Sequence, residues 1–205
     1  MKKSLFLLIL GAAMVFVTGC AKEPKENISP VTPSKALISI LKNDYKVVME
    51  RYPGADTTFV EARCTLDHPI TQVSSASELN LVKVNEVYYR YHSEEHRSHL
   101  VFVERDFEEG TNQMQYVESE APWFGDKQIP ATSLDSMISL HQAIRCLMAS
   151  GKSLPATQFV TLRYPVYVFD KGHALYIFGG RNAEGMHLMV DSYTGEVYTN
   201  ERDPE

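Results

Sequence analysis

The residues best suited to bind a metal ion gather between positions 92 and 99. His92, His96 and His99 flank the pair Glu94 and Glu95. Imidazole nitrogens and carboxylate oxygens are ligands that suit Zn²⁺, so one hypothesis is a metal-binding protein. On a hairpin, however, His92 and His99 belong to the two strands while His96 lies at the tip, which favours a solvated polar turn. We therefore expect no metal ion and no other cofactor.

Motifs that carry enzyme nucleophiles or bind phosphate groups are missing from the sequence. Neither G-x-S-x-G nor H-E-x-x-H occurs, and no glycine-rich phosphate loop precedes a helix. The run Gly179-Gly180-Arg181 follows an expected strand but leads into Asn-Ala-Glu-Gly, which favours a hairpin turn. The other histidines show no motif spacing: His68, His141, His173 and His187. These observations favour a binding protein over an enzyme, with no small-molecule substrate evident.

Cys20 is the residue with the clearest chemical context. A basic start, Lys2-Lys3, precedes an almost entirely apolar run over residues 5–17, which is shorter than the ~20 residues that a membrane-spanning helix needs. The sequence Val17-Thr18-Gly19-Cys20 resembles a bacterial lipobox. The resemblance implies that a lipoprotein signal peptidase removes residues 1–19 and that Cys20 then carries the lipid. Ordinary secretion with a chance cysteine is the alternative.

A lipid on Cys20 decides where the protein resides. Two or more acyl chains anchor a protein stably, so the mature chain is expected on a membrane without spanning it. Residues 20–34 contain three prolines and few apolar residues, which is typical of an extended tether. Ala21 stands where an aspartate would favour retention in the inner membrane. The expected location is therefore the outer membrane, on its periplasmic face or at the cell surface.

Composition narrows the class of partner. The chain has 205 residues, 44% of them hydrophobic and 22% charged, which are ordinary values for a globular protein. Its net charge is −6, so a nucleic-acid binder that neutralises phosphates is disfavoured. An envelope protein or a secreted protein is the expected partner. A structural or assembly role among neighbouring outer-membrane components is the alternative.

The elements that would position a binding surface occur in the same order twice. Apolar residues at helical spacing predict a first helix that ends before Pro53-Gly54 and a second that begins near Ser133 or Ser136 and ends before Gly151. A β-favouring run follows each helix. We expect an α+β fold of two units in tandem, each with one helix on an antiparallel sheet. Half 1 covers residues 35–117, a connecting loop covers 118–133, and half 2 covers 134–205.

The two β-favouring runs also match residue for residue, which indicates a duplicated unit. The matching residues are Thr57, Phe59, Val60 and Arg63 in the first run and Thr157, Phe159, Val160 and Arg163 in the second. If the halves are repeats, Phe59 and Phe159 should occupy equivalent positions, each pointing at its own helix.

Aromatic residues are the candidates for contact with a partner. Alternation along a strand places Tyr89 and Tyr91 on one face and Tyr88 on the other. One face of an antiparallel sheet is often uncovered, so either Tyr88 or the pair of Tyr89 with Tyr91 could form a recognition surface. Trp123 and Phe124 lie in the connecting loop, where they either anchor a partner or seal the junction between the halves.

Residues 190–197 resemble the end of a PepSY domain. That family closes with a strand that ends in aspartate, a turn through Thr-Gly and a return strand, matched here by Asp191, Thr194 and Gly195. Asp191 can accept backbone N–H groups across the turn, and Gly195 supplies the positive φ of the reversal. The resemblance extends over about residues 134–200 and more weakly to half 1, which is similar to the β-lactamase inhibitor protein fold. It implies a binding or inhibitor-like module with no catalytic centre.

Cys64 and Cys146 fall in an expected strand and the second expected helix. In an oxidising envelope the two could form a disulfide bond. In a duplicated fold they could instead lie in separate cores as buried thiols. The sequence leaves both alternatives open.

Overall fold

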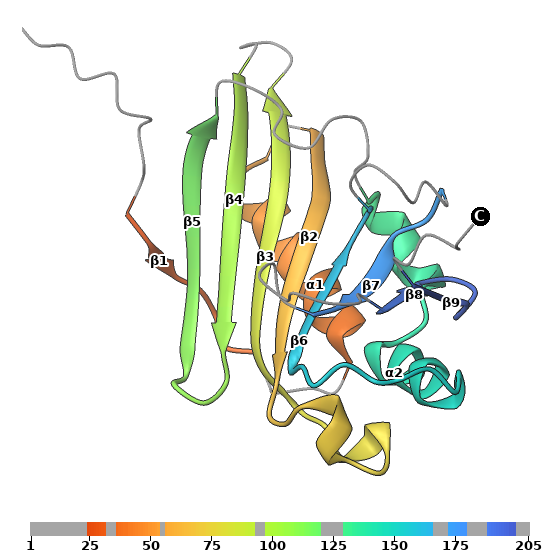
Figure 1. The fold of residues 1–205 in the computed structure, drawn as a ribbon. Helices are drawn as coiled ribbons and strands as arrows, with labels where there is room; N and C mark the ends of the chain where they lie inside the picture. The colour runs from red at the N-terminus through yellow and green to blue at the C-terminus, as the bar shows by residue number, and fades with distance from the viewer. Residues whose placement is uncertain are drawn as a thin grey trace, which may run out of the picture.

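The computed structural model describes residues 24–31, 36–53, 56–92, 97–119, 129–165, 172–179 and 188–199. In these residues the chain forms two α-helices and a nine-stranded antiparallel sheet (Figure 1). The helices are α1 (Leu37–Arg51) and α2 (Leu140–Ala149). The strands are β1 (Glu26–Asn27), β2 (Asp56–Leu66), β3 (Leu81–His92), β4 (Arg97–Asp106), β5 (Thr111–Ser119), β6 (Phe159–Arg163), β7 (Leu175–Phe178), β8 (Leu188–Asp191) and β9 (Val197–Thr199). The predicted α+β class is confirmed.

The order of strands in the sheet is β1-β5-β4-β3-β2-β6-β7-β8-β9. Each helix is followed by four consecutive strands that pair as a meander, β2 to β5 after α1 and β6 to β9 after α2. The first strands of the two meanders, β2 and β6, are neighbours, with Ala62 opposite Leu162. The halves thus share one continuous sheet, whereas the sequence predicted one sheet for each.

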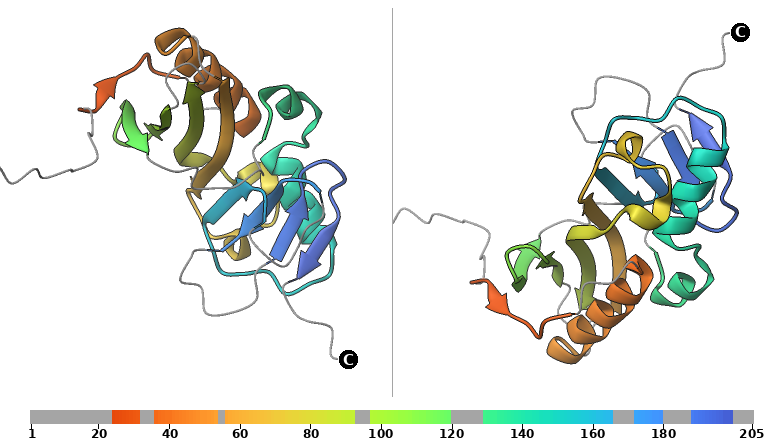
Figure 2. Two further views of the ribbon diagram at one scale, coloured as in Figure 1. Left: turned by 90° about the horizontal axis from the view of Figure 1, so that it is seen from above. Right: turned by 90° about the horizontal axis from the view of Figure 1, so that it is seen from below.

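Both helices pack on the same face of this sheet (Figure 2). Leu37, Leu41 and Val48 of α1 are fully buried there, as are Ile144 and Leu147 of α2. Burying a side chain of this size contributes roughly 1.5–3 kcal/mol, so these apolar stripes hold the helices on the sheet. No helix in the described part of the chain has both the length and the hydrophobicity needed to cross a membrane.

The second helix begins later than the sequence predicted. Residues Ala131–Ser136 form a 3₁₀ helix, and α2 starts only after Ser139. Ser139 Oγ accepts a hydrogen bond from the Gln142 N–H at 3.2 Å, while Gln142 Oε1 accepts one from the Ser139 N–H at 2.7 Å. This reciprocal capping box pairs backbone N–H groups that the start of a helix otherwise leaves without a partner. Ser139 is therefore the cap, and neither Ser133 nor Ser136 begins the helix.

The expected equivalence of Phe59 and Phe159 is wrong. Phe59 is fully buried on the helix-covered face, whereas Phe159 is 49% exposed. The cause is a β-bulge in β2, where the pairing with β3 shifts register between Phe59 and Glu61 and leaves Val60 as an extra residue. The extra residue reverses the alternation, so Phe59 and the later core residues of β2 point to one face. β6 pairs regularly, and Phe159, three residues before the buried Leu162, points to the opposite face.

The first described residues lie along the outer edge of the sheet. β1 pairs with β5, with Glu26 opposite Met114. Arg51, at the end of α1, donates to both carboxylate oxygens of Glu26, at 2.7 and 3.0 Å. Part of the stretch that the sequence predicted to be a tether is thus docked on the sheet.

Candidate binding face

The face of the sheet turned away from the helices carries the candidate functional residues. In β3, Val84 and Tyr88 contribute to the core beneath the helices, so alternation sends Val87 to the opposite face. Cross-strand pairing then places Phe102 of β4 opposite Val87. We call this the open face, because no helix of the described residues covers it (Figure 2). It is formed by alternate residues of β2 to β6.

An apolar cluster occupies part of the open face and consists of Val60, Val87, Leu100, Tyr89 and Phe102. Val60 reaches this face because it is the extra residue of the β-bulge. Val60, Val87 and Leu100 are buried, while the larger rings packed against them stay partly exposed. Tyr91, on the same side of β3, is 37% exposed. Aromatic rings that are partly buried and partly exposed to solvent are well placed to contact a second protein.

A cavity of about 390 Å³ borders the cluster. Val87 and Phe102 belong to its apolar lining. Its polar lining includes Lys25, Glu61, Arg63, Asn85, Glu104 and Gln113. A cavity of this volume accepts a small ligand or one large side chain of another protein.

Glu61 is the buried acid of the open face. Its carboxylate forms ion pairs with Arg63 at 2.5 Å and with Arg163 at 3.4 Å, although its side chain is only 2% exposed. The two guanidinium groups offset the cost of taking the carboxylate out of water. Because Arg163 belongs to β6, this ion-pair group spans the boundary between the two meanders.

Glu104 has a similar arrangement farther toward the edge of the sheet. Its carboxylate lies 2.8 Å from Lys25 Nζ and 2.7 Å from Lys83 Nζ. Hydrogen bonds from Lys25 and Lys83 lower the pKa of Glu104, and the Glu104 carboxylate in turn raises the pKa of Lys83. The charges that line the cavity are therefore mutually paired. Shape and hydrogen bonding, more than net charge, would select what fills it.

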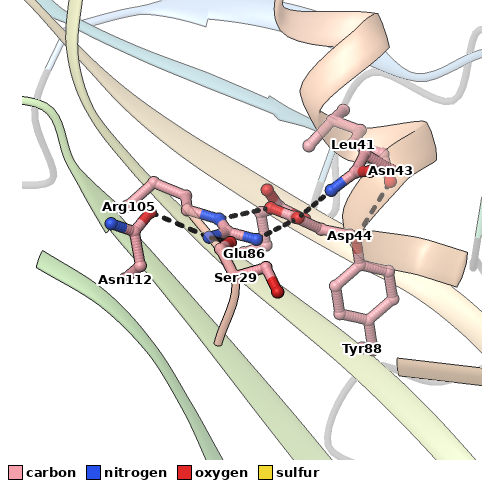
Figure 3. Close-up of polar contacts among 8 residues, drawn as sticks. All are labelled: Ser29, Leu41, Asn43, Asp44, Glu86, Tyr88, Arg105 and Asn112. Carbon is pink, nitrogen blue, oxygen red and sulfur yellow. Dashed lines mark hydrogen bonds and ion pairs between the residues drawn. The ribbon is translucent and has the colours of Figure 1, made fainter. Parts of the chain in front are cut away.

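On the opposite side of the sheet, a buried ion pair fixes α1 in place (Figure 3). Arg105 of β4 and Asp44 of α1 are both fully buried. The guanidinium donates to Asp44 through Nη2 at 2.5 Å and Nε at 3.0 Å, and Nη1 donates to the Ser29 carbonyl at 2.6 Å and Asn112 Oδ1 at 2.8 Å. Removing one partner of such a pair costs about 3–5 kcal/mol. This geometry assigns Arg105 a structural role.

Glu86 and Tyr88 complete the buried polar group (Figure 3). The Tyr88 hydroxyl donates to Glu86 Oε2 and lies 3.3 Å from the Leu41 carbonyl oxygen of α1. Burial raises the pKa of Glu86 well above its ordinary value, and the neighbouring Asp44 carboxylate raises it further. Glu86 is therefore expected to hold a proton under conditions in which an exposed glutamate is ionised.

The structure distinguishes the two predicted tyrosine faces. Tyr88 is fully buried and contacts α1, so its assignment as a partner-binding residue is wrong. Tyr89 and Tyr91 lie on the open face. The remaining predicted site residues lie outside the described residues: Cys20, Trp123 and Phe124.

The metal-binding hypothesis gains no support from the residues that can be placed. His99 is buried, and its ring stacks on Tyr116 with 4.4 Å between centroids. The side chain of His92 and all of His96 lie outside the described residues. Within the described ranges, no three potential ligands lie close enough together to hold a metal ion.

The C-terminal turn has the predicted geometry. Asp191 Oδ1 accepts the N–H groups of Tyr193 at 2.8 Å and Thr194 at 2.9 Å, and Gly195 has a φ of 76°. His173 adds a contact that no sequence motif indicates, with Nδ1 at 2.9 Å from Asp191 Oδ2. Burial raises the pKa of Asp191, but the backbone N–H groups and His173 lower it on balance. The predicted residues of this turn thus have a structural role.

Cys64 and Cys146 are free thiols, so the disulfide alternative is not realised. Cys64 is buried in the core, and burial raises the pKa of its thiol far above the ordinary value. Cys146 is partly buried and packs against the same core. The thiols are unpaired, as the second alternative predicted, but they pack against one shared core and not two separate ones, and Cys146 is only partly buried.

Comparisons with known proteins give few further indications. No family model matches the chain. No curated protein matches it either. Among solved structures, the chain is similar to a candidate lipoprotein from Clostridium difficile 630, with 9% identity and a TM-score of 0.43. The match covers 81% of this chain and 99% of that one. A similarity of this size does not establish a shared function.

Proposed function

We propose that the chain is a lipid-anchored binding module of the cell envelope, which holds a protein partner on its open face and carries out no catalysis. The observation that supports this proposal best is the apolar cluster on a sheet face that no described helix covers. Tyr89, Tyr91 and Phe102 stay partly exposed there. Aromatic surface of this kind is stabilised when another protein covers it and removes it from water.

The surroundings of the cluster also suit a protein partner. Protein interfaces combine an apolar, aromatic-rich centre with a polar rim. On the open face, the ion pairs of Glu61 and Glu104 supply such a rim. The cavity beside Phe102 is large enough for one bulky side chain of the partner. If the partner is an enzyme, the module would be inhibitor-like.

The anchor in this proposal is a lipid on Cys20. The basic start, the short apolar run and the lipobox-like residues before Cys20 support it. A protein with two or more acyl chains stays on the membrane without a spanning helix. Ala21 favours the outer membrane over the inner membrane in this proposal.

We also propose that the two meanders are PepSY-like units in tandem. Support comes from the repeated order of one helix and four strands, and from Ala62 pairing directly with Leu162. Ala62 and Leu162 are separated in sequence by the same number of residues as Thr57 and Thr157. A two-fold axis through the pair would therefore superpose residues that the sequence aligns. The β-bulge at Val60 is the departure from this symmetry that the structure reveals.

Site-specific photo-cross-linking in cells tests the open face. A photoreactive amino acid replaces Tyr91 in the full-length protein, and a control variant carries it at Ser39, which is exposed on α1. We expect Tyr91 to cross-link to one defined envelope protein and Ser39 to give no cross-link to it. Equal cross-linking from both positions would show that the open face is not the binding site.

The identified partner then allows affinity measurements. Phe102→Glu places a charge within the apolar cluster and is expected to weaken binding at least tenfold, whereas Ser39→Glu should bind as the unaltered chain does. An unchanged affinity for a folded Phe102→Glu variant would contradict the proposal. An enzyme as partner would indicate inhibition, and an outer-membrane component would indicate the structural or assembly role.

A further inference from the structure

Arg90 is a buried cation on the helix-covered face, two residues before the end of β3. Its side chain is fully buried. Nε donates to Thr57 Oγ1 at 2.8 Å, but Nη1 and Nη2 have no hydrogen-bond partner among the residues that the structure describes. Within the described residues, no carboxylate forms an ion pair with Arg90. This is unlike Arg105, whose guanidinium has an anion and several oxygen acceptors.

The Tyr52 ring, which belongs to an aromatic stack, lies beside the guanidinium. Its central carbon lies 5.2 Å from the centroid of the Tyr52 ring. Tyr52 stacks on Tyr116 at 4.5 Å, and Tyr116 stacks on His99 at 4.4 Å. Tyr52 and Tyr116 are themselves only partly buried, so this aromatic stack extends from Arg90 to the surface.

This environment leaves the charge of Arg90 only partly compensated. Attraction between a cation and an aromatic face offsets part of the cost of burial, but it leaves the N–H donors without acceptors. Buried donors without acceptors are rare in folded proteins and call for an explanation by an absent group. Burial lowers the pKa of Arg90, and neighbouring tyrosines oppose this only in part. The missing group must therefore be an acceptor, and a negative charge suits it best.

We propose that Arg90 is the binding residue for a small oxyanion, held by Nη1 and Nη2 in a site walled by Tyr52 and Tyr116. The two terminal nitrogens of a guanidinium match two oxygens of one carboxylate or phosphate group. The ligand class is therefore an anion that presents a pair of oxygens. Tyr52 and Tyr116 close the site in this proposal. The Tyr52 ring, just beyond the end of α1, must therefore rotate to admit the anion. This site lies on the opposite side of the sheet from the open face and does not depend on the proposed protein partner.

Thermal unfolding of the full-length protein in a neutral detergent tests the site. Inorganic phosphate and acetate are titrated in separate arms at constant ionic strength, with chloride as the reference. A ligand that binds only the folded state raises the melting temperature as its concentration increases. We expect a rise of several degrees with phosphate, acetate or both. A rise in one arm alone identifies phosphate or carboxylate as the ligand group, and a rise in neither overturns the proposal.

Substitutions of Arg90 test whether this residue causes the rise in melting temperature. Arg90→Met should remove the response to the anion, and Arg90→Lys, which keeps the charge but loses the paired donors, should weaken binding at least tenfold. Arg145→Met, at an exposed position of α2, is the matched control and should respond as the unaltered chain does. If Arg90→Met does not fold, Arg90→Lys alone decides. An anion response that is unchanged in either folded Arg90 variant would refute the proposal.

Discussion

At position 195 the fold has room for a hydrogen atom as the side chain. Gly195 has a φ of 76°, a left-handed conformation that other residues rarely adopt. A Cβ atom there would also lie 2.9 Å from Cys146 Sγ of α2. The glycine thus forms the turn before β9 and lets α2 approach that turn closely.

The substitution Gly195→Ala should lower the free energy of unfolding by about 2–3 kcal/mol. A left-handed alanine costs roughly 1–2 kcal/mol, and crowding against Cys146 adds to that cost. Gly110→Ala is the matched control, because Gly110 has a φ of 70° and its added Cβ would meet no atom within 4 Å. Urea unfolding compares the two variants. Equal losses would show that the contact with Cys146 contributes nothing.

Glu86 should make the stability of the protein depend on pH. Its pKa in the folded state lies well above that of an exposed glutamate because of burial and the nearby Asp44. Its stabilising contribution is therefore fully present below the ordinary glutamate pKa and is lost as the pH rises through the folded-state pKa. Glu86→Gln cannot ionise, so its stability should fall less than that of the unaltered chain as the pH rises from the ordinary glutamate pKa into the alkaline range.

Urea unfolding at several pH values across that range tests Glu86. The control is Glu50→Gln, which makes the same substitution at an exposed position of α1. Parallel stability curves for the unaltered chain and Glu86→Gln would mean that Glu86 does not titrate differently on folding.

At the scale of single strands, the sequence predicted which residues share one face of a strand. It did not predict how one strand pairs with the next. Alternation correctly separates Tyr88 from Tyr89 and Tyr91, but it does not say which face the helices cover. The bulge at Val60 has no local signal, because it is a property of how β2 pairs with β3. The ion pair between Arg105 and Asp44 was missed for the same reason, since it joins residues 61 positions apart.

The bulge leads to a prediction about two phenylalanines that occupy aligned positions in sequence. Phe59 is fully buried and lies edge-on to Tyr88 with 5.6 Å between ring centroids, so Phe59→Ala should cost about 3–5 kcal/mol. Phe159 is 49% exposed, so Phe159→Ala should change stability by less than about 1 kcal/mol. Denaturant unfolding of both variants checks this. Similar losses would mean that the two strands do present these residues to equivalent environments.

For the whole molecule, the fold class and the order of elements could be predicted, but the single shared sheet could not. Each meander would leave the edge of its first strand, β2 or β6, unpaired if it stood alone. Pairing β2 with β6 removes both of those edges. Edge pairing of this kind depends on the assembled surfaces of two units, which no local pattern encodes.

The anchor proposal has a direct test in cells. Cys20→Ser should leave the protein without lipid and move it from the membrane fraction to the supernatant, because a polar tether cannot hold it on a bilayer. Cys146→Ser is the control and should remain with the membrane. Fractionation with a high-salt wash, followed by immunodetection, gives the distribution. A Cys20→Ser protein that stays in the washed membrane pellet would contradict lipid anchoring.

The docking of β1 on β5 limits how far a lipid-anchored form of this molecule can travel from its membrane. The chain between Cys20 and Glu26 can extend at most about 20 Å, so the edge of the sheet would stay close to the lipid headgroups. Detaching β1 together with Ser29, whose carbonyl accepts a hydrogen bond from Arg105, would free the chain as far as Leu37 and lengthen this segment to about 60 Å. Lys25 lies within that same segment and lines the cavity. Tension on this segment would therefore act directly on the cavity wall. An occupant that holds Lys25 in place would keep the segment docked and the sheet close to the membrane.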